Sequence, residues 1–174
     1  MNETIQNLKT RRSCRKYRPE QLSRDELNTI LEAGTYAPTG RGRQSPIIVV
    51  VQDPKKIRQI ERLNSAVKGN PDAPAFYGAP TLLIVFGQTN VPFGVSDGNL
   101  VIGNLLNAVH AIGVDSCYIW QAKEVFETEE GKAIQASWNI PDNYAGVGNV
   151  ILGYGAAGGT GEPRPRKEDY IRFV

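Results

Sequence analysis

Histidine and cysteine are scarce in this sequence of 174 residues, which contains one histidine, His110, and two cysteines, Cys14 and Cys117. A structural zinc site takes about four such ligands, so we expect no metal centre. The cysteines lie far apart and no segment resembles an export signal, which favours free thiols in a reducing, cytoplasmic compartment. Histidine catalysis would depend on His110 alone, and its apolar neighbours at helical spacing predict a buried structural residue.

Long apolar runs and a large net charge are also absent. The longest apolar stretches, at 47–51 and 81–86, are far shorter than the ~18 residues that span a bilayer, so we expect no membrane association. The net charge of +2 argues against general nucleic-acid binding. Positive charge is concentrated at 11–18 and 164–167, which favours a small anionic ligand. Two alternatives remain open: solvated surface patches, or nucleic-acid binding by 11–18 with an affinity that falls steeply with salt.

The hydrophobic pattern predicts a single domain over residues 1–174 in which helices and strands are interspersed. Ser23 and Glu26 form a capping box that starts a helix running to Gly34. Apolar residues at helical spacing from about 96 to 112 predict the longest helix, which we expect to be central. We also expect helices ending near Thr10, starting at 53 and over 128–137, strands over 47–51, 82–86, 114–120 and 147–152, and mostly loop over 64–79. These elements predict a domain of two or three layers.

Three glycines, Gly153, Gly155 and Gly158, match the G-x-G-x-x-G spacing of a dinucleotide-binding turn and follow a predicted strand. Such a turn must open a helix, and an acidic residue must follow about 20 positions later. The residues after Gly158 read GTGEPRPR, which starts no helix, and too few residues remain for a helix and another strand. We therefore interpret the glycines as a turn. Gly153 still lies at a strand end, where a flat ligand can approach the backbone closely.

The basic clusters have the spacing of a phosphate site. Arg11, Ser13 and Arg15 alternate, so in an extended segment their side chains point the same way. Arg164 and Arg166 also alternate, with Pro165 between them keeping the chain extended. Guanidinium groups bind phosphate oxygens in pairs, and a hydroxyl adds a further donor.

Four segments, taken in order, resemble the FMN-dependent nitroreductase family. RRSCRKY at 11–17 is similar to the family's R-[RH]-S-x-[RK]-x-[FY] motif, and APTGRGRQSP at 37–46 is similar to its A-P-[ST]-x-x-N-x-Q-P loop. SDGNLVIGNLLNAVHAIGVDSCYI at 96–119 resembles its long central helix leading into a strand. VILGYG at 150–155, followed by a tail rich in proline and arginine, resembles its last strand.

The resemblance implies an α+β fold, with a mixed β-sheet flanked by helices and a long central helix. It also implies an obligate homodimer with FMN at the interface. Arg11, Arg12, Ser13 and Arg15 would hold the phosphate and ribityl chain, and Arg164 and Arg166 would close on the phosphate. Pro38, Thr39 and Gly40 would come from the partner chain to the flavin ring, with Gln44 matching the glutamine of the loop. Ile119 and Trp120 would meet the pyrimidine side of the ring, and Gly153 would lie near the phosphate-side backbone.

Two departures from the family loop bear on these roles. Gly42 stands where the family usually has asparagine, which removes one side-chain hydrogen bond to the cofactor, and an extra Ser45 separates Gln44 from Pro46.

The activity that the resemblance implies is reduction of nitroaromatics, quinones or a related acceptor by NADH or NADPH, in ping-pong two-electron transfer without a catalytic side chain. A non-catalytic flavin-binding module on the same fold is the alternative. Tyr77, Phe93 and Trp120 are candidates for the acceptor wall, with ordinary packing as the other interpretation.

Overall fold

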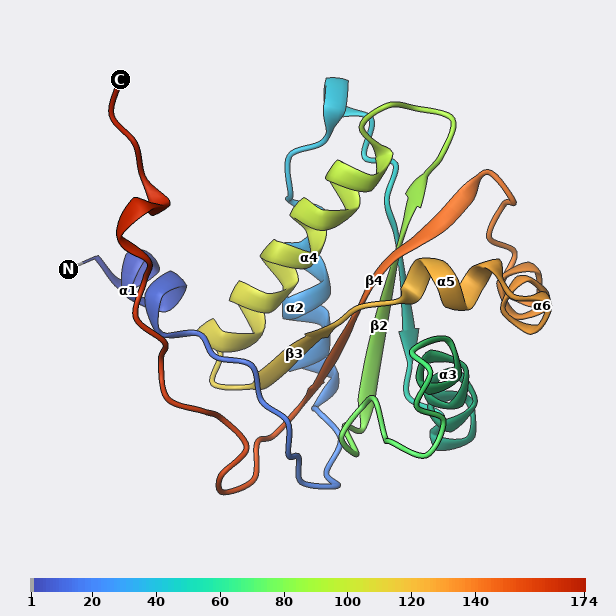
Figure 1. Ribbon diagram of the computed structural model, residues 1–174, viewed down its shortest axis with the longest axis horizontal. Coiled ribbons are helices and arrows are strands. Elements are labelled where there is room, and N and C mark those ends of the chain that lie inside the picture. The colour runs from blue at the N-terminus through green and yellow to red at the C-terminus, as the bar shows by residue number, and fades with distance from the viewer. Residues whose placement is uncertain (1) are drawn as a thin grey trace.

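A four-stranded antiparallel sheet organises the chain in the computed structural model, which describes residues 2–174 (Figure 1). The strands lie in the order β1-β2-β4-β3. The two central strands are buried on both faces, as their nearly continuous apolar sequences predict. Outside the four strands, Ser13 forms an isolated parallel bridge with Ser116 of β3. The bounds are Ile47–Val51 for β1, Thr81–Gln88 for β2, Asp115–Ile119 for β3 and Tyr144–Gly153 for β4.

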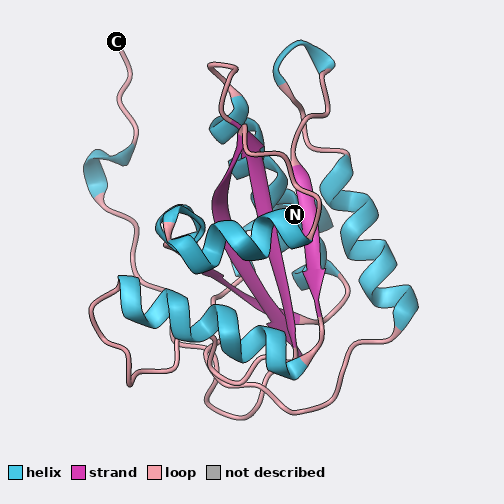
Figure 2. Cartoon of the chain, turned by 90° about the vertical axis from the view of Figure 1, so that its right-hand side faces the viewer, coloured by secondary structure: helices cyan, strands magenta, loops and turns pink. Residues whose placement is uncertain are grey.

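Helices cover both faces of the sheet and give three layers. On one face lie α2 (Arg24–Thr35) and α4 (Gly94–Ala111), with α1 (Glu3–Thr10) against the end of α4. On the other face lie α3 (Pro54–Val67), α5 (Ala122–Glu127) and α6 (Glu129–Ser137), which cross in front of the strands in Figure 2. In the part of the chain that the structure describes, no helix is both long and apolar enough to cross a membrane.

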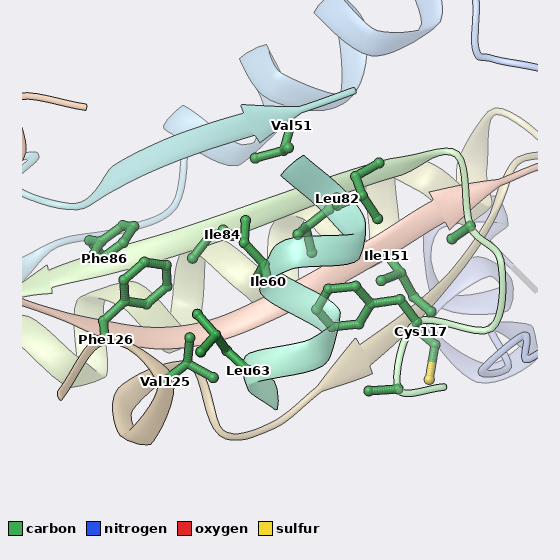
Figure 3. Close-up of a cluster of buried hydrophobic side chains, with 14 of the residues drawn as sticks. Val51, Ile60, Leu63, Leu82, Ile84, Phe86, Cys117, Val125, Phe126 and Ile151 are labelled. Carbon is green, nitrogen blue, oxygen red and sulfur yellow. The ribbon is translucent and has the colours of Figure 1, made fainter. Parts of the chain in front are cut away.

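Two apolar cores fill the space between the layers, because alternate residues of a strand face opposite sides. Leu82, Ile84 and Phe86 of β2 pack against α3 and α5 (Figure 3). There the Phe86 and Phe126 rings meet edge to face, with centroids 4.7 Å apart. Leu83 and Val85 pack on the other side, against α2 and α4.

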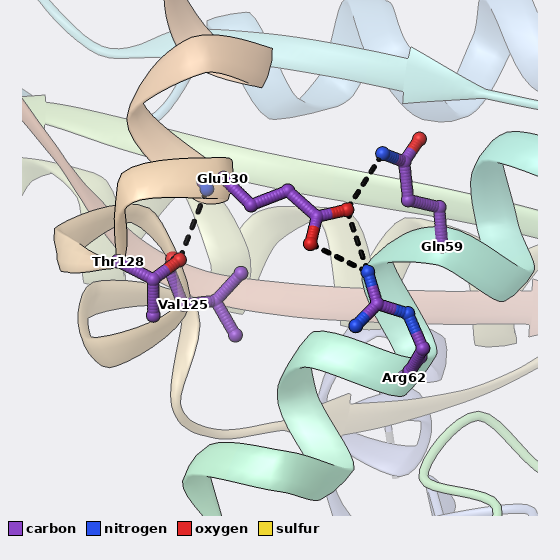
Figure 4. Close-up of polar contacts among 6 residues, drawn as sticks. Gln59, Arg62, Val125, Thr128 and Glu130 are labelled. Atoms are coloured by element: carbon purple, nitrogen blue, oxygen red, sulfur yellow. Dashed lines mark hydrogen bonds and ion pairs between the residues drawn. The ribbon is translucent and has the colours of Figure 1, made fainter.

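Local signals explain how several helices start. The capping box is confirmed: the Ser23 N–H donates to Glu26 Oε2 at 2.8 Å, and the Glu26 N–H donates to Ser23 Oγ at 3.3 Å. Asp53 caps α3, and Pro54 occupies its first turn. Arg62 Nη2 donates to both oxygens of the Glu130 carboxylate, and Gln59 Nε2 donates to Oε1. These contacts tie α3 to α6 (Figure 4). These hydrogen bonds, the one from Arg62 above all, hold the pKa of Glu130 below its usual range.

Three expectations need correction. Residues 64–67 belong to α3 rather than to a loop, because Asn64 and Ser65 turn inward and bond to distant backbone carbonyls. Helix α5 was not expected, since six residues are too few to show a helical period. His110 is half-buried rather than buried, and its Nε2 lies 2.8 Å from the Thr10 hydroxyl where α1 meets α4.

Candidate functional site

The basic segment 11–18 is extended, as its alternation predicts, and lies between β3 and the glycine-rich turn. The Cys14 N–H donates to the Ser116 carbonyl at 2.9 Å, and the Arg15 N–H donates to Gly159 O at 2.8 Å. Cys14 is fully buried and Arg15 is exposed. A side chain at Gly159 would place its Cβ 2.7 Å from Cys14 Sγ, so the turn packs on this segment. Close packing against Cys14 therefore accounts for the glycine at position 159.

A hollow of about 240 Å³ opens beside Arg15, and we call it the Arg15–Trp120 pocket. It brings together three residues expected from the sequence: Arg15, Ile119 and Trp120. Tyr77, a candidate for the acceptor wall, lies there as well. The full lining consists of Arg15, Asn64, Lys68, Ala75, Tyr77, Cys117, Tyr118, Ile119, Trp120 and Gln121.

Sequence reasoning missed Asn64, Lys68 and Gln121. Asn64 is fully buried at the C-terminal end of α3, and its Nδ2 donates to the Trp120 carbonyl at 2.8 Å. Its Oδ1 has no hydrogen-bond partner among the described residues. Gln121, with φ of 73°, directs the chain from β3 into α5. The sequence did contain a signal for Asn64. It is a polar residue at helical spacing from Ile57, Ile60 and Leu63, which otherwise form an apolar stripe.

The other predicted phosphate ligands lie outside this lining. Arg12 Nη1 donates to the carbonyls of Lys9 and Arg11, both at 2.8 Å. Ser13 pairs with Ser116 in the parallel bridge. Arg164 and Arg166 are exposed in the C-terminal tail, drawn in red in Figure 1. Their roles stay predictions.

Gly153 ends β4 opposite Asp115. A Cβ there would lie 2.7 Å from Pro80 Cδ and 3.3 Å from a Tyr17 ring carbon. Packing against Pro80 and Tyr17 therefore accounts for the glycine without a ligand, and its predicted place near the phosphate also stays a prediction.

The loop 37–44 forms a second surface, a hollow of about 590 Å³ lined by Pro38, Thr39, Gly42 and Gln44 together with residues 35–37. The Gly40 N–H donates to Asp97 Oδ1 at 2.9 Å, and the Gln44 N–H donates to Thr39 Oγ1 at 2.9 Å. Arg41, Gly42 and Gln44 all have positive φ, so the loop is held in a tightly turned conformation. The ring of Phe93, a candidate for the acceptor wall, packs directly against Gly40.

These two surfaces are separate within one chain. They share no lining residue, and Figure 1 shows the short helix at Gly40–Gly42 and the segment 11–18 at opposite ends of the molecule. The Arg15–Trp120 pocket, at about 240 Å³, is also smaller than the ~300–1,000 Å³ of typical small-molecule sites. Within one chain the two hollows are therefore distinct.

Comparison with known proteins gives a consistent result. The family model described as "Nitroreductase family" matches residues 8–154. A crystal structure of a nitroreductase with bound FMN from Bacteroides fragilis is 31% identical over 100% of both chains, with a TM-score of 0.91. One from Desulfitobacterium hafniense, also with bound FMN, is 24% identical and shares the fold, with a TM-score of 0.88 over 100% of this chain and 99% of that one. A Bacillus subtilis protein named FMN reductase [NAD(P)H] is 24% identical over 97% of this chain and 72% of its own length.

Proposed function

The chain belongs to the nitroreductase family, and we propose that it is an FMN-dependent oxidoreductase that uses NADH or NADPH to reduce nitroaromatics, quinones or a related small acceptor. The observation that carries the proposal is the full-length likeness, at 31% identity, to a nitroreductase with bound FMN. The Arg15–Trp120 pocket supplies independent chemical support.

The residues of this pocket fit a flavin. Asn64 Oδ1 is a buried acceptor without a partner among residues 2–174, and an N–H on the pyrimidine edge of a flavin would satisfy it. Ile119 and Trp120 offer apolar surface to a flat ring, and 65% of Trp120 is exposed. Arg15 and Lys68 supply positive charge for a phosphate or for an anionic reduced ring.

Bound FMN would supply the hydride chemistry, while the chain binds, orients and partly shields it from water. Arg15 and Lys68 would stabilise negative charge, and Asn64 would hold the ring edge. His110 contacts Thr10 at the α1–α4 junction, so we assign it no proton transfer. We propose that solvent supplies the proton. One open ring face would serve the nicotinamide donor and the acceptor in turn, which gives ping-pong kinetics.

The site is completed, in this proposal, by a second copy of the chain. The pocket is small and open, and the loop with Pro38, Thr39, Gly40 and Gln44 lies apart from it in its own chain. Apolar side chains are exposed on α4, with Val95 at 55% and Leu100 at 48%, as expected for a face that another subunit covers. The phosphate would be held by Arg11, Arg12, Ser13, Arg164 and Arg166.

The free, buried Cys14 and Cys117 suit a reducing, cytoplasmic location.

The test is an anaerobic absorbance spectrum of the purified protein before and after NADH or NADPH, followed by addition of a quinone or nitroaromatic. Flavin bands that bleach with either donor and return with acceptor are the expected result. Bands that neither donor bleaches would favour the non-catalytic flavin-binding alternative. A protein that stays colourless after incubation with FMN would overturn the proposal. Light scattering of the FMN-loaded protein should give the mass of two chains.

A further inference from the structure

Asn149, in the middle of β4, is a polar residue in an apolar layer. It is fully buried, and neither its Oδ1 nor its Nδ2 has a hydrogen-bond partner in the part of the chain that the structure describes. A leucine has the same branching and would suit an apolar layer without any polar atom to satisfy. Buried carboxamides are nearly always hydrogen-bonded, so this one calls for an additional partner.

The strand register places Asn149 next to the Arg15–Trp120 pocket. Asn149 lies directly opposite Ile84 of β2 and Ile119 of β3. Directly opposed residues share a face of a sheet, and Ile84 belongs to the core on the α3 side. The Asn149 side chain therefore lies on the α3 side of the sheet. Asn64 of α3 reaches the end of β3 from this same side.

Asn64 reaches the residue next to Ile119, since its Nδ2 donates to the Trp120 carbonyl at 2.8 Å. Its Oδ1 is also unpaired among the described residues. Asn64 thus bonds to the residue that follows Ile119, which is the strand partner of Asn149, and three of the four side-chain polar atoms of the two asparagines lack partners among residues 2–174. An internal water makes about three hydrogen bonds to such groups. A carboxamide offers both donors and an acceptor, so one water can join two of them.

We propose that Asn149 is a positioning residue of the cofactor site, and that it holds the carboxamide of Asn64 through an internal water. This link fixes the direction of Asn64 Oδ1 at the pocket wall and steadies the Ile119–Trp120 backbone. The cofactor part of the inference rests on the proposed function. The proposed water-mediated contact between the two asparagines does not require the cofactor and is expected in the apoprotein as well.

The experiment is a double-mutant cycle with two readouts. Asn149→Leu, Asn64→Leu and the double variant are unfolded in urea as apoproteins, and their FMN affinities are then measured by fluorescence titration. Asn149→Leu should weaken FMN binding about tenfold or more, yet weaken it no further in the Asn64→Leu background. The two urea effects should be non-additive, because either change breaks the same link.

The matched control is Ile84→Val, which alters the residue opposite Asn149 on the same face. It should lower the urea midpoint by creating a small cavity, while FMN affinity stays within about twofold. If Asn149→Leu does not fold, Asn149→Ala removes the carboxamide without adding volume, and the same cycle applies.

Each result has a defined meaning. Unchanged FMN affinity in Asn149→Leu, or fully additive effects in both readouts, overturns the inference while leaving the proposed function intact. Additive unfolding together with higher stability of Asn149→Leu also overturns it, because the carboxamide then has no partner to lose. A wild-type protein that binds no FMN overturns the proposed function, and the urea cycle of the apoproteins still decides whether the two asparagines are coupled.

Discussion

The backbone N–H of Gly40 donates a hydrogen bond of 2.9 Å to Oδ1 of Asp97, although the two residues are 57 positions apart. Asp97 lies in the first turn of α4 and is nearly fully buried. The bond therefore ties the turned loop 37–44 to the long central helix. Because this loop is proposed to complete the flavin site of the partner subunit, its conformation affects both stability and cofactor binding.

Asp97→Ala should release the loop. We expect a loss of about 1 kcal/mol in unfolding free energy, less than the ~1.5–3 kcal/mol of a hydrogen bond to a charged group. The loss is smaller because alanine also removes the buried Oδ2, which has no partner among residues 2–174. FMN should bind more weakly. Asp97→Asn keeps an oxygen acceptor for Gly40 and serves as the control in urea unfolding and FMN titration. A more stable Asp97→Ala protein would contradict the assignment.

Gly40→Ala tests the same loop through packing. The added Cβ would lie 2.5 Å from Phe93 Cγ, so the ring or the loop must move. Overpacking of this kind costs about 1–3 kcal/mol, measurable as a lower urea midpoint. Gly161→Ala is the control, because nothing lies within 4 Å of a Cβ there. Equal midpoints for the two variants would show that the contact with Phe93 is easily relieved.

Arg15→Ala tests the cationic rim of the Arg15–Trp120 pocket. Loss of a hydrogen bond to a charged phosphate or reduced flavin should weaken FMN binding by about 1.5–3 kcal/mol. Lys16→Ala is the matched control, since this neighbouring cation is exposed and does not line the pocket. The measurement is fluorescence titration at two salt concentrations. Similar losses in both variants would indicate a general charge effect rather than a site.

Tyr154→Phe tests the hydrogen bond that the Tyr154 hydroxyl donates to the Glu26 carboxylate of the capping box. The Ser23 hydroxyl, then Tyr154 and the Ser23 N–H, hold the pKa of Glu26 below its ordinary value of 4.5. A lowered carboxyl pKa stabilises the fold above that value, and the stabilisation is lost as pH falls through the lower folded-state pKa. Tyr154→Phe should therefore lower the urea midpoint at pH 7, and this loss should shrink as acid protonates the Glu26 carboxylate. A loss that does not change with pH would mean that the Tyr154 hydroxyl stabilises the fold independently of the charge on Glu26, since phenylalanine keeps the ring.

The two thiols should react slowly in the native protein. Cys14 is fully buried, burial raises the pKa of its thiol, and the thiol donates to the Lys16 carbonyl at 3.2 Å. Cys117 is also buried. A thiol reagent at pH 8 should label neither residue on the timescale on which it labels the unfolded protein. Rapid labelling of Cys14, identified by mass spectrometry, would contradict its burial beneath the glycine-rich turn.

Local sequence features predicted most of the framework. The capping box at Ser23 and Glu26, the apolar runs of β1 and β2 and the long period of α4 all depend on near neighbours in the chain, and all are confirmed. The family resemblance drawn from the order of four motifs is confirmed by the family match. Helix α5 and the last turn of α3 were missed because tertiary contacts, rather than propensity, stabilise them.

The sequence by itself determined the layered α+β fold, the positions of the basic clusters and the family, because periodicity, caps and motif order need no knowledge of distant contacts. Only the tertiary structure decided which polar groups meet. It placed Arg15, Asn64 and Trp120 around one pocket, and it left the buried side chain of Asn149, opposite Ile119 of β3, without a hydrogen-bond partner among the described residues. These relationships depend on strand register and on where a helix reaches the sheet, and both are set by packing between residues remote in sequence.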